Sequence, residues 1–271
     1  MAKYEKYTLA VGKQDEKRLG ALNNICNPVT RRFLDESEIL LQGKHIVDLG
    51  CGIGMMSVEF AKRVGPTGRV TAVDISEEQL DLAREYAKLH NINNIEFVCH
   101  EAYKLHELKL KADMVYIRFL LEHLSQPLEA LKQATLILND NGYLFCETVT
   151  SYAAMFSDPP SDVFDQWLKA RLLQPELYNT DFYIGKRLAS HFKTLGLKLI
   201  KSELQQPILN PGEDRENFLS GLKPESIRAR YVEKGFFTPE EIQSIADNII
   251  ELSREDILMT FPQYIQILGR K

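Results

Sequence analysis

Residues 46–54 read Ile-Val-Asp-Leu-Gly-Cys-Gly-Ile-Gly, and this stretch decides the fold that we expect. Its apolar start predicts a buried β-strand, and the three alternating glycines predict a tight turn with positive φ angles. The next residues, Met55 to Val64, have the pattern of a helix. Such a turn leaves free backbone N–H groups and the positive end of a helix dipole, so a ligand rich in acceptors would bind there. A tight turn without any ligand is the alternative.

Further strands follow the first one at intervals, with helices between them. Strands that alternate with helices imply crossover connections and therefore a parallel sheet with helices on both faces. The last two strands are separated by an insert and suggest an antiparallel hairpin at the sheet edge. An Asn-Asp-Asn-Gly cluster at 139–142 predicts a turn before the fifth strand. The later strands are expected at residues 69–73, 95–99, 113–117, 143–149, 197–207 and 260–268.

Three segments lie outside this alternation and predict a helical cap. Residues 1–42 are expected to be an N-terminal cap segment in which Pro28 divides the helical pattern into two helices. Residues 43–271 would form the main domain. Its cap insertions would be an irregular one with short helices at about 151–182 and a helical one at about 210–255.

The cap segments are rich in aromatic residues, which suggests an apolar or aromatic small molecule in a closed pocket. For any single ring, a place in the cap's own core is the favoured interpretation. The aromatic residues concerned are Tyr4, Tyr7, Phe156, Phe164, Trp167, Tyr178, Phe182, Tyr183, Phe218, Tyr231, Phe236 and Phe237.

Composition narrows the class of protein. The 271 residues are 44% hydrophobic and 26% charged, which is ordinary for a globular protein. No apolar run reaches the roughly 18 residues that a membrane span needs, and the first residues are polar, so we expect a cytoplasmic protein without a membrane partner. The net charge of -5, with both signs mixed along the chain, argues against a nucleic-acid partner.

Neither the cysteines nor the histidines are spaced like metal ligands. The four cysteines include no Cys-x-x-Cys pair, so we expect buried free thiols rather than disulfides or a zinc site. The six histidines are scattered along the sequence, and no metal site is expected.

Two acidic residues make the glycine turn more specific. Asp74 ends the next strand, where a carboxylate can accept hydrogen bonds from both ribose hydroxyls of an adenosine. The alternative is that Asp74 caps the following helix, although Ser76 is better placed for that role. Asp48 lies within the first strand and needs partners if it is buried, such as the turn's amides or the ammonium group of a cofactor.

Together these motifs resemble those of the class I S-adenosylmethionine-dependent methyltransferases. Residues 47–54 look like motif I of that family, and Asp74 matches its ribose-binding acid. Glu101-Ala102 resembles the acidic and small pair that meets adenine. Residues 112–118, Ala-Asp-Met-Val-Tyr-Ile-Arg, resemble the fourth-strand motif, and further similar motifs follow at 126–131 and 141–144. The resemblance covers about residues 40–150, whereas residues 151–271 match only in layout.

The resemblance implies an α/β fold of Rossmann-like type. Its seven-stranded sheet would have the order 3-2-1-4-5-7-6, with strand 7 antiparallel and helices on both faces. It also implies S-adenosyl-L-methionine as cofactor and S-adenosyl-L-homocysteine as product. Gly50 and Gly52 would line the methionine part, Asp48 would reach the ammonium group, and Glu101 would bind the adenine amine. The expected cofactor-binding residues are Asp48, Gly50, Cys51, Gly52, Gly54, Asp74, Ile75, Glu101, Ala102 and Arg118.

The implied reaction is an in-line transfer of a methyl group to an O-, N- or C-nucleophile of a small molecule. Alignment and exclusion of water are the main tasks, and a general base is needed only if the nucleophile arrives protonated. The candidate catalytic residues are His123, Arg118 and Glu147. His123 could accept a proton but fits a backbone-bonded histidine better. Arg118 could bind a substrate carboxylate or hold the cofactor loop, and Glu147 fits a structural acid equally well.

Two other functions stay open at this point. One is a cofactor-binding regulator that has lost catalysis, and the other is a nicotinamide-dependent oxidoreductase. The Gly-x-Gly-x-Gly spacing and Glu101-Ala102 argue against the oxidoreductase. We therefore expect an enzyme of the EC 2.1.1 class with a small-molecule partner, as a monomer or a homodimer.

Overall fold

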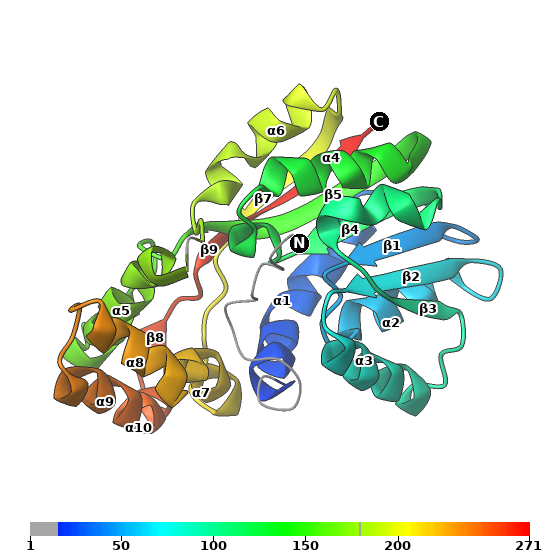
Figure 1. Ribbon diagram of the computed structural model, residues 1–271. Helices are drawn as coiled ribbons and strands as arrows, with labels where there is room; N and C mark the ends of the chain where they lie inside the picture. The colour runs from blue at the N-terminus through cyan, green and yellow to red at the C-terminus, as the bar shows by residue number, and fades with distance from the viewer. Residues whose placement is uncertain (1–15, 179) are drawn as a thin grey trace.

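The computed structural model describes residues 16–178 and 180–271, and its centre is a seven-stranded sheet (Figure 1). The strand order is β3-β2-β1-β4-β5-β9-β7, and β9 runs antiparallel to both β5 and β7. The predicted order, with its antiparallel last strand, is thereby confirmed. The strands are β1 (His45–Leu49), β2 (Arg69–Asp74), β3 (Ile95–Cys99), β4 (Ala112–Arg118), β5 (Leu138–Ser151), β7 (Lys198–Gln205) and β9 (Gln263–Arg270).

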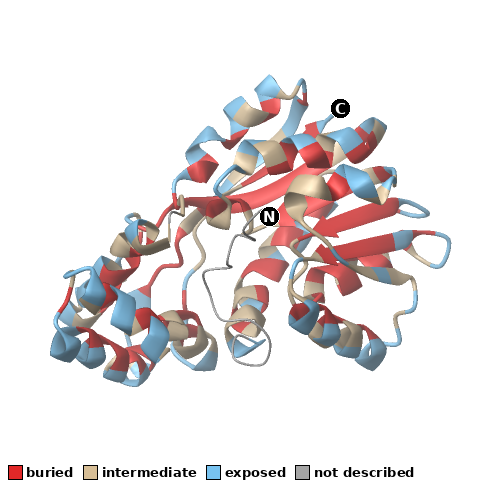
Figure 2. Ribbon diagram, viewed as in Figure 1, coloured by how far each residue is buried: buried red, intermediate tan, exposed pale blue. Residues whose placement is uncertain are grey.

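Helices cover both faces of the sheet (Figure 1). The helices α2 (Met55–Val64) and α3 (Glu77–Leu89) lie on one face, and α4 (Pro127–Ile137) and α6 (Leu188–Thr194) lie on the other. Because side chains alternate along a strand, each strand contributes to two cores. In β1, Ile46 belongs to the core that contains α2, whereas Val47 belongs to the core that contains α4. Figure 2 shows the buried strands between these layers.

The chain after β5 forms most of a second, mainly helical lobe, which we call the cap (Figure 1). It contains its own apolar core, with Trp167 and Tyr231 among its fully buried residues. A small antiparallel pair, β6 (Ser157–Asp158) with β8 (Leu258–Met259), also belongs to it and was not predicted. The cap helices are α5 (Asp162–Tyr178), α7 (Glu213–Leu219), α8 (Glu225–Glu233), α9 (Pro239–Asp247) and α10 (Ile249–Arg254), with a 3-10 turn, η5 (Ser220–Leu222).

The expectation of short helices in residues 151–182 is wrong, since α5 is a single helix of 17 residues that contains Pro175. Its buried residues Phe164, Trp167, Ala170, Arg171 and Gln174 recur every three or four positions, which is the spacing of one helix face. Burial of this face against the cap offsets the cost of a proline within the helix.

The prediction that Pro28 divides the N-terminal segment into two helices is also wrong, because α1 runs unbroken from Glu16 to Glu36. Pro28 lies on the exposed side of this helix, while Cys26, Phe33 and Leu34 are buried. The buried side therefore holds the helix together across the proline. The first 15 residues of the predicted segment, with Tyr4 and Tyr7, lie outside the described residues.

The predicted turn at 139–142 is part of β5 instead. Leu138 pairs with Ala112 and Tyr143 pairs with Met114, so the register shifts between the two pairs and the extra residues form a bulge. Asn141 has a φ of 64°, which explains why the sequence of this bulge resembles that of a turn.

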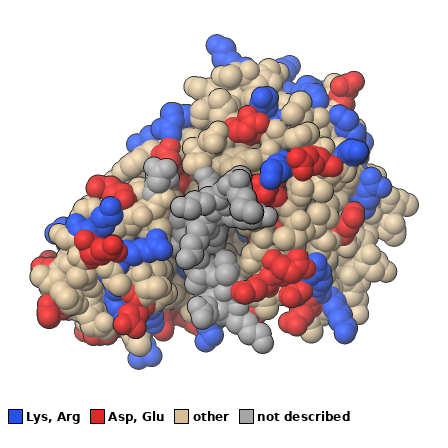
Figure 3. Space-filling view, in the orientation of Figure 1, with Lys and Arg blue, Asp and Glu red and all other residues tan. Residues whose placement is uncertain are grey.

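The face of the molecule in Figure 3 carries acidic and basic side chains in a mixed arrangement. Within residues 16–178 and 180–271, no helix combines the length and the apolar character that crossing a membrane requires. The same residues contain no group of three or more histidine, cysteine, aspartate or glutamate side chains placed to hold a metal ion.

Candidate functional site

The glycine turn after β1 leaves open space beside its backbone. Gly52 has a φ of 54°, and among the described residues a Cβ atom added there would have only Leu19 Cδ1 within 4 Å, at 3.8 Å. At Gly54 the reason for glycine is different, since an added Cβ would lie 2.7 Å from the Cβ of Ala83 on α3. Gly54 therefore permits close helix packing, while Gly52 leaves room for a ligand against the backbone.

The Asp74 carboxylate at the end of β2 organises this turn. The N–H of Gly52 donates to Oδ2 over 2.9 Å, and the N–H of Ser76 donates to Oδ1 over 3.0 Å. Burial raises the pKa of Asp74, and these backbone donors oppose the shift. Ser76 caps α3 through Gln79, as the sequence indicated. Because a carboxylate has about four acceptor positions, Asp74 keeps capacity for further donors.

Asp48 in β1 is buried and has a partner that the sequence analysis missed. Ser57 Oγ on α2 donates to its Oδ2 over 2.5 Å. Burial raises the pKa of Asp48 to about 6, while the Ser57 hydrogen bond and the positive charge of Arg118 act in the opposite direction. A cation bound beside Asp48 would further favour its ionised form.

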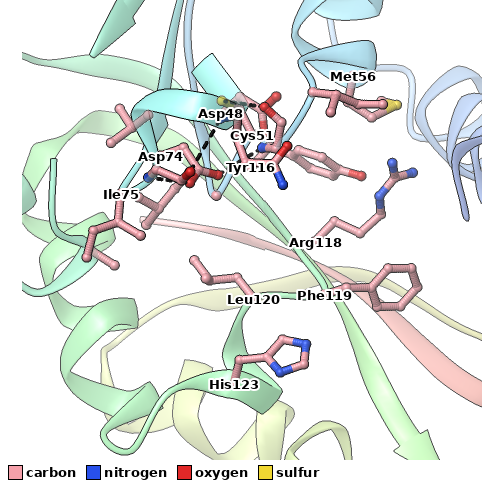
Figure 4. Close-up of a pocket in the computed structure, with 18 of the residues that line it drawn as sticks. Asp48, Cys51, Met56, Asp74, Ile75, Tyr116, Arg118, Phe119, Leu120 and His123 are labelled. Atoms are coloured by element: carbon pink, nitrogen blue, oxygen red, sulfur yellow. Dashed lines mark hydrogen bonds between the residues drawn. The ribbon is translucent and has the colours of Figure 1, made fainter. Parts of the chain in front are cut away.

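A cavity of about 400 Å³ lies against the turn and the carboxyl ends of β1, β2 and β4. All the predicted cofactor-binding residues except Gly54 border it. Figure 4 shows Asp74 and Cys51 at one end and His123 at the other, with Leu120 between them. Glu101, just after β3, also borders the cavity and forms an ion pair of 2.9 Å with Lys104.

One wall of the cavity comes from α1, which the sequence analysis assigned to the cap without naming its contacts. Leu19, Leu22 and Asn23 border the cavity, at a spacing that places them on one helix face. Arg118 at the end of β4 donates to Asn23 Oδ1 over 2.6 Å and to Asn27 Oδ1 over 2.7 Å. Arg118 therefore lines the cavity and also fixes α1 over the sheet.

Glu147 on β5 is buried away from the cavity. Its carboxylate accepts hydrogen bonds from Thr30 on α1, Tyr116 on β4 and Gln266 on β9. It borders neither the cavity nor the smaller pocket beside it. The continuous α1 covers this part of the sheet, so we no longer expect a catalytic role for Glu147.

His123 lies in the turn η3 (Leu121–His123) and borders both the cavity and the smaller pocket. Burial lowers its pKa to about 3, and the positive charges of Arg18 and Arg171 act in the same direction. His123 is therefore neutral near pH 7 and a weak proton acceptor in this state.

The smaller pocket has a volume of about 40 Å³ and adjoins the cavity. Arg18, Leu22, Phe119 and His123 border both spaces. Glu122, which the sequence analysis did not select, also lines the smaller pocket. Burial raises its pKa to about 7, against a hydrogen bond from Thr148.

Most of the predicted cap aromatics serve the cap itself. Among those that the structure describes, only Phe182 and Phe218 border the smaller pocket. Phe164, Trp167 and Tyr231 are buried within the cap core. Most of the described cap aromatics therefore belong to the core of the cap, as the favoured interpretation predicted.

The fold and site define a class of protein. A doubly wound sheet with a glycine turn after β1 and acids at the next strand ends is typical of α/β proteins that bind an adenosine-containing cofactor. The chain belongs to the methyltransferase-domain family, whose model matches residues 21–202. It is therefore a class I S-adenosylmethionine-dependent methyltransferase by family, as its motifs indicated.

Known proteins resemble about half of the chain. It is 32% identical over 126 residues to the ubiquinone biosynthesis O-methyltransferase of Coxiella burnetii, which is 46% of this chain and 52% of that protein. It is 31% identical over 134 residues to the demethylmenaquinone methyltransferase of Staphylococcus aureus, which is 48% of this chain and 55% of that protein. The matches thus span about half the length of these relatives.

A solved structure extends the similarity of fold over most of the chain. A Bacillus halodurans C-125 protein assigned as a methyltransferase aligns with a TM-score of 0.59 over 89% of this chain and 97% of its own. The sequence identity is 16%, so this match concerns the fold.

Proposed function

We propose that the protein transfers a methyl group from S-adenosyl-L-methionine to a small-molecule acceptor. The observation that carries this proposal is the cavity in which Asp48, the glycine turn, Asp74 and Glu101 meet, with a second pocket directly beside it. One space suits an adenosine-containing cofactor, and the other suits a small group of an acceptor whose reacting part lies where the two spaces join. Both are bordered by residues of α1, which would shield the reacting groups from water.

The residues present fit the cofactor. The open space beside Gly52 suits close approach to the turn, and Asp74 has acceptor capacity for two ribose hydroxyls. Glu101 would accept from the adenine amine, and Asp48 would pair with the ammonium group. When bound, the cofactor supplies a methyl group on a positively charged sulfur.

Proton removal from the acceptor is assigned to Glu122 rather than to His123. A base works best when its pKa lies near the operating pH, and the pKa of Glu122 is about 7 whereas that of His123 is about 3. Both side chains border the smaller pocket. His123 would then orient the acceptor at the junction of the two spaces.

The acceptor is proposed to be an apolar or aromatic small molecule. The rings of Phe119, Phe182, Phe218 and Phe261 border the smaller pocket, which favours an acceptor whose body is apolar and flat. The names of the two relatives, which refer to ubiquinone and demethylmenaquinone, also favour a cyclic acceptor.

The test uses S-adenosyl-L-methionine labelled in its methyl group, incubated with the protein and a small-molecule extract. We expect labelled product and S-adenosyl-L-homocysteine to form in equal amounts, with Glu122→Gln slowing their formation. Cofactor binding without transfer of label to any acceptor would favour the regulator instead. Labelled product formed equally well by Glu122→Gln would refute only the role of Glu122.

A further inference from the structure

Arg171 on α5 is a buried cation beside the proposed acceptor site. Arg171 is only 9% exposed, and it borders the smaller pocket together with Glu122 and His123. Taking a guanidinium group out of water is costly unless an anion or a full set of acceptors replaces the water. The surroundings of Arg171 therefore show whether the protein itself supplies that compensation.

The described residues compensate only in part for the loss of water around the Arg171 guanidinium group. Arg171 donates to the Tyr152 hydroxyl over 2.7 Å and to Gln174 Oε1, while its Nε has no hydrogen-bond partner. No carboxylate of residues 16–178 and 180–271 lies within ion-pair distance of it. The rings of Tyr152 and Phe182 lie 4.7 and 5.4 Å from the guanidinium carbon. These contacts orient the guanidinium group but do not neutralise it.

Arg215 in the same lobe shows what a structural buried arginine looks like here. It is 1% exposed, and all three of its side-chain nitrogens donate to backbone carbonyls. The acceptors are the carbonyls of Leu209, Leu252, Glu255 and Ile257. Arg215 borders neither the cavity nor the smaller pocket. Arg171, which borders the smaller pocket, thus lacks the full set of hydrogen-bond acceptors that Arg215 has away from it.

Among the described residues that line the smaller pocket, the arginines outnumber the acids. Arg18 and Arg171 both border it, and their charges both lower the pKa of His123, which is neutral near pH 7. Glu122 is the one acid among the described residues that line it, and burial raises its pKa to about 7. An anion in the pocket would therefore be attracted by the guanidinium group of Arg171 and, below pH 7, would meet a mostly uncharged Glu122.

We propose that this pocket binds a carboxylate group of the methyl acceptor, with Arg171 as its anchor. The substrate class would then be small apolar or aromatic acids, a conclusion that rests on the proposed function. The planar guanidinium group matches a carboxylate, to which it can donate two parallel hydrogen bonds. A space of about 40 Å³ suits a group of this size.

Acetate is the probe for this site, because it is the smallest carboxylic acid that carries an apolar group. Acetamide is its neutral counterpart of the same shape. Thermal unfolding of the full chain would be followed at constant ionic strength in increasing concentrations of each. We expect acetate, but not acetamide, to raise the melting temperature. The apparent Kd for acetate should rise about tenfold or more in Arg171→Gln, which loses a charge-assisted pair. Arg230→Gln, an exposed cap arginine with the same charge change, should behave as the unchanged protein.

Equal stabilisation by acetate and acetamide, no effect of acetate, or an unaltered acetate Kd in Arg171→Gln would each overturn the proposal. Arg171→Lys gives a second variant should the first fail to fold. It should bind acetate more weakly than the unchanged protein, and an unaltered Kd there would also contradict the assignment.

Titration with S-adenosyl-L-homocysteine distinguishes a failure of the carboxylate site from a failure of the proposed function. If Arg171→Gln binds it normally but is insensitive to acetate, the acceptor site is affected alone. If the unchanged protein does not bind it, the proposed function itself fails.

Discussion

Asp74 holds the glycine turn and the start of α3 with one carboxylate, through Gly52 and Ser76. The ribose role assigned to it would use the acceptor capacity that remains. Both functions depend on the same two oxygen atoms, so a change at Asp74 acts on binding and on the shape of the turn.

Asp74→Ala should weaken binding of S-adenosyl-L-methionine by about 1–3 kcal/mol, because ribose hydroxyls and the Gly52 amide lose their acceptor. Calorimetric titration measures this change, with circular dichroism to verify folding. Asp81→Ala, at an exposed position on α3, is the control and should leave affinity unchanged. A folded Asp74→Ala protein with normal affinity would refute the ribose role.

Glu122 should make the protein less stable as the pH rises. Its pKa is about 7 in the folded state against an ordinary 4.5, so between these values the unfolded chain releases a proton that the folded protein keeps. The free energy of unfolding therefore falls as the pH increases through this window, by a total of roughly 3 kcal/mol. This fall in stability is complete above pH 7.

Glu122→Gln removes this contribution, so its stability relative to the unchanged protein should increase between pH 5 and pH 8. Urea unfolding at both pH values gives the difference directly. Glu78→Gln, at an exposed position on α3, should show no such change. A constant difference between Glu122→Gln and the unchanged protein at both pH values would mean that Glu122 titrates normally.

The sequence was informative about individual residues wherever a motif fixes them locally. Asp48, Asp74 and Glu101 were expected at the cavity because the ends of parallel strands meet at one edge of a sheet, and they border it. Arg171 and Ser57 were missed because their role depends on neighbours that are distant or unpatterned in the sequence. The catalytic and structural interpretations of Glu147 could not be separated from the sequence because its surroundings depend on where α1 lies.

At the scale of elements, α1 is a part of the site rather than a separate cap. Arg118 bonds to Asn23 and Asn27, and Leu19 and Leu22 form the wall opposite the glycine turn. The same helix packs against α7 of the cap. It therefore links the sheet to the cap, directly over the cavity.

Replacing Asn23 and Asn27 together by alanine should loosen α1. The half-buried Arg118 guanidinium group would lose two acceptors, each worth about 1–3 kcal/mol in such a place. Hydrogen exchange should become faster along α1, and affinity for S-adenosyl-L-methionine should fall. Asn24→Ala, which removes an exposed contact of the same helix with Asp214, is the control. Unchanged exchange in the double variant would mean that packing alone holds α1.

Pro28→Ala should stabilise the protein, because Pro28 lies at an exposed position inside a continuous helix. A proline there costs about 3 kcal/mol in lost hydrogen bonding and clashes, partly returned through the stiffer unfolded chain. We expect a net gain of about 1–2 kcal/mol in the free energy of unfolding, measured by urea titration. A loss of stability would show that the helix is shaped around the proline.

Element types were predictable where hydrophobic periodicity is regular, and less so where tertiary packing decides. The strands β1 to β4 follow from short apolar runs bounded by turns. α1 and α5 each contain a proline that local rules treat as a break, but burial of one helix face outweighs it. The bulge in β5 has the composition of a turn, so sequence alone could not place it inside a strand.

At the scale of the molecule, a sheet lobe and a cap lobe lie side by side (Figure 1), and residues of both line the smaller pocket. The cavity at the glycine turn is built from the ends of β1, β2 and β4, so its residues could be predicted from motifs in the sequence. The acceptor end combines η3, α1, α5, η5 and β5 with the chain between β8 and β9, which lie far apart in the sequence. Such a site follows from how the cap folds back, and no local pattern encodes it.

The central claim is that the cavity at the glycine turn binds S-adenosyl-L-methionine, and calorimetric titration of the unchanged protein tests it most directly. Parallel titrations with S-adenosyl-L-methionine and with NAD would be compared under the same conditions. The account predicts saturable binding of one S-adenosyl-L-methionine per chain and no binding of NAD. Binding of NAD without binding of S-adenosyl-L-methionine would contradict it.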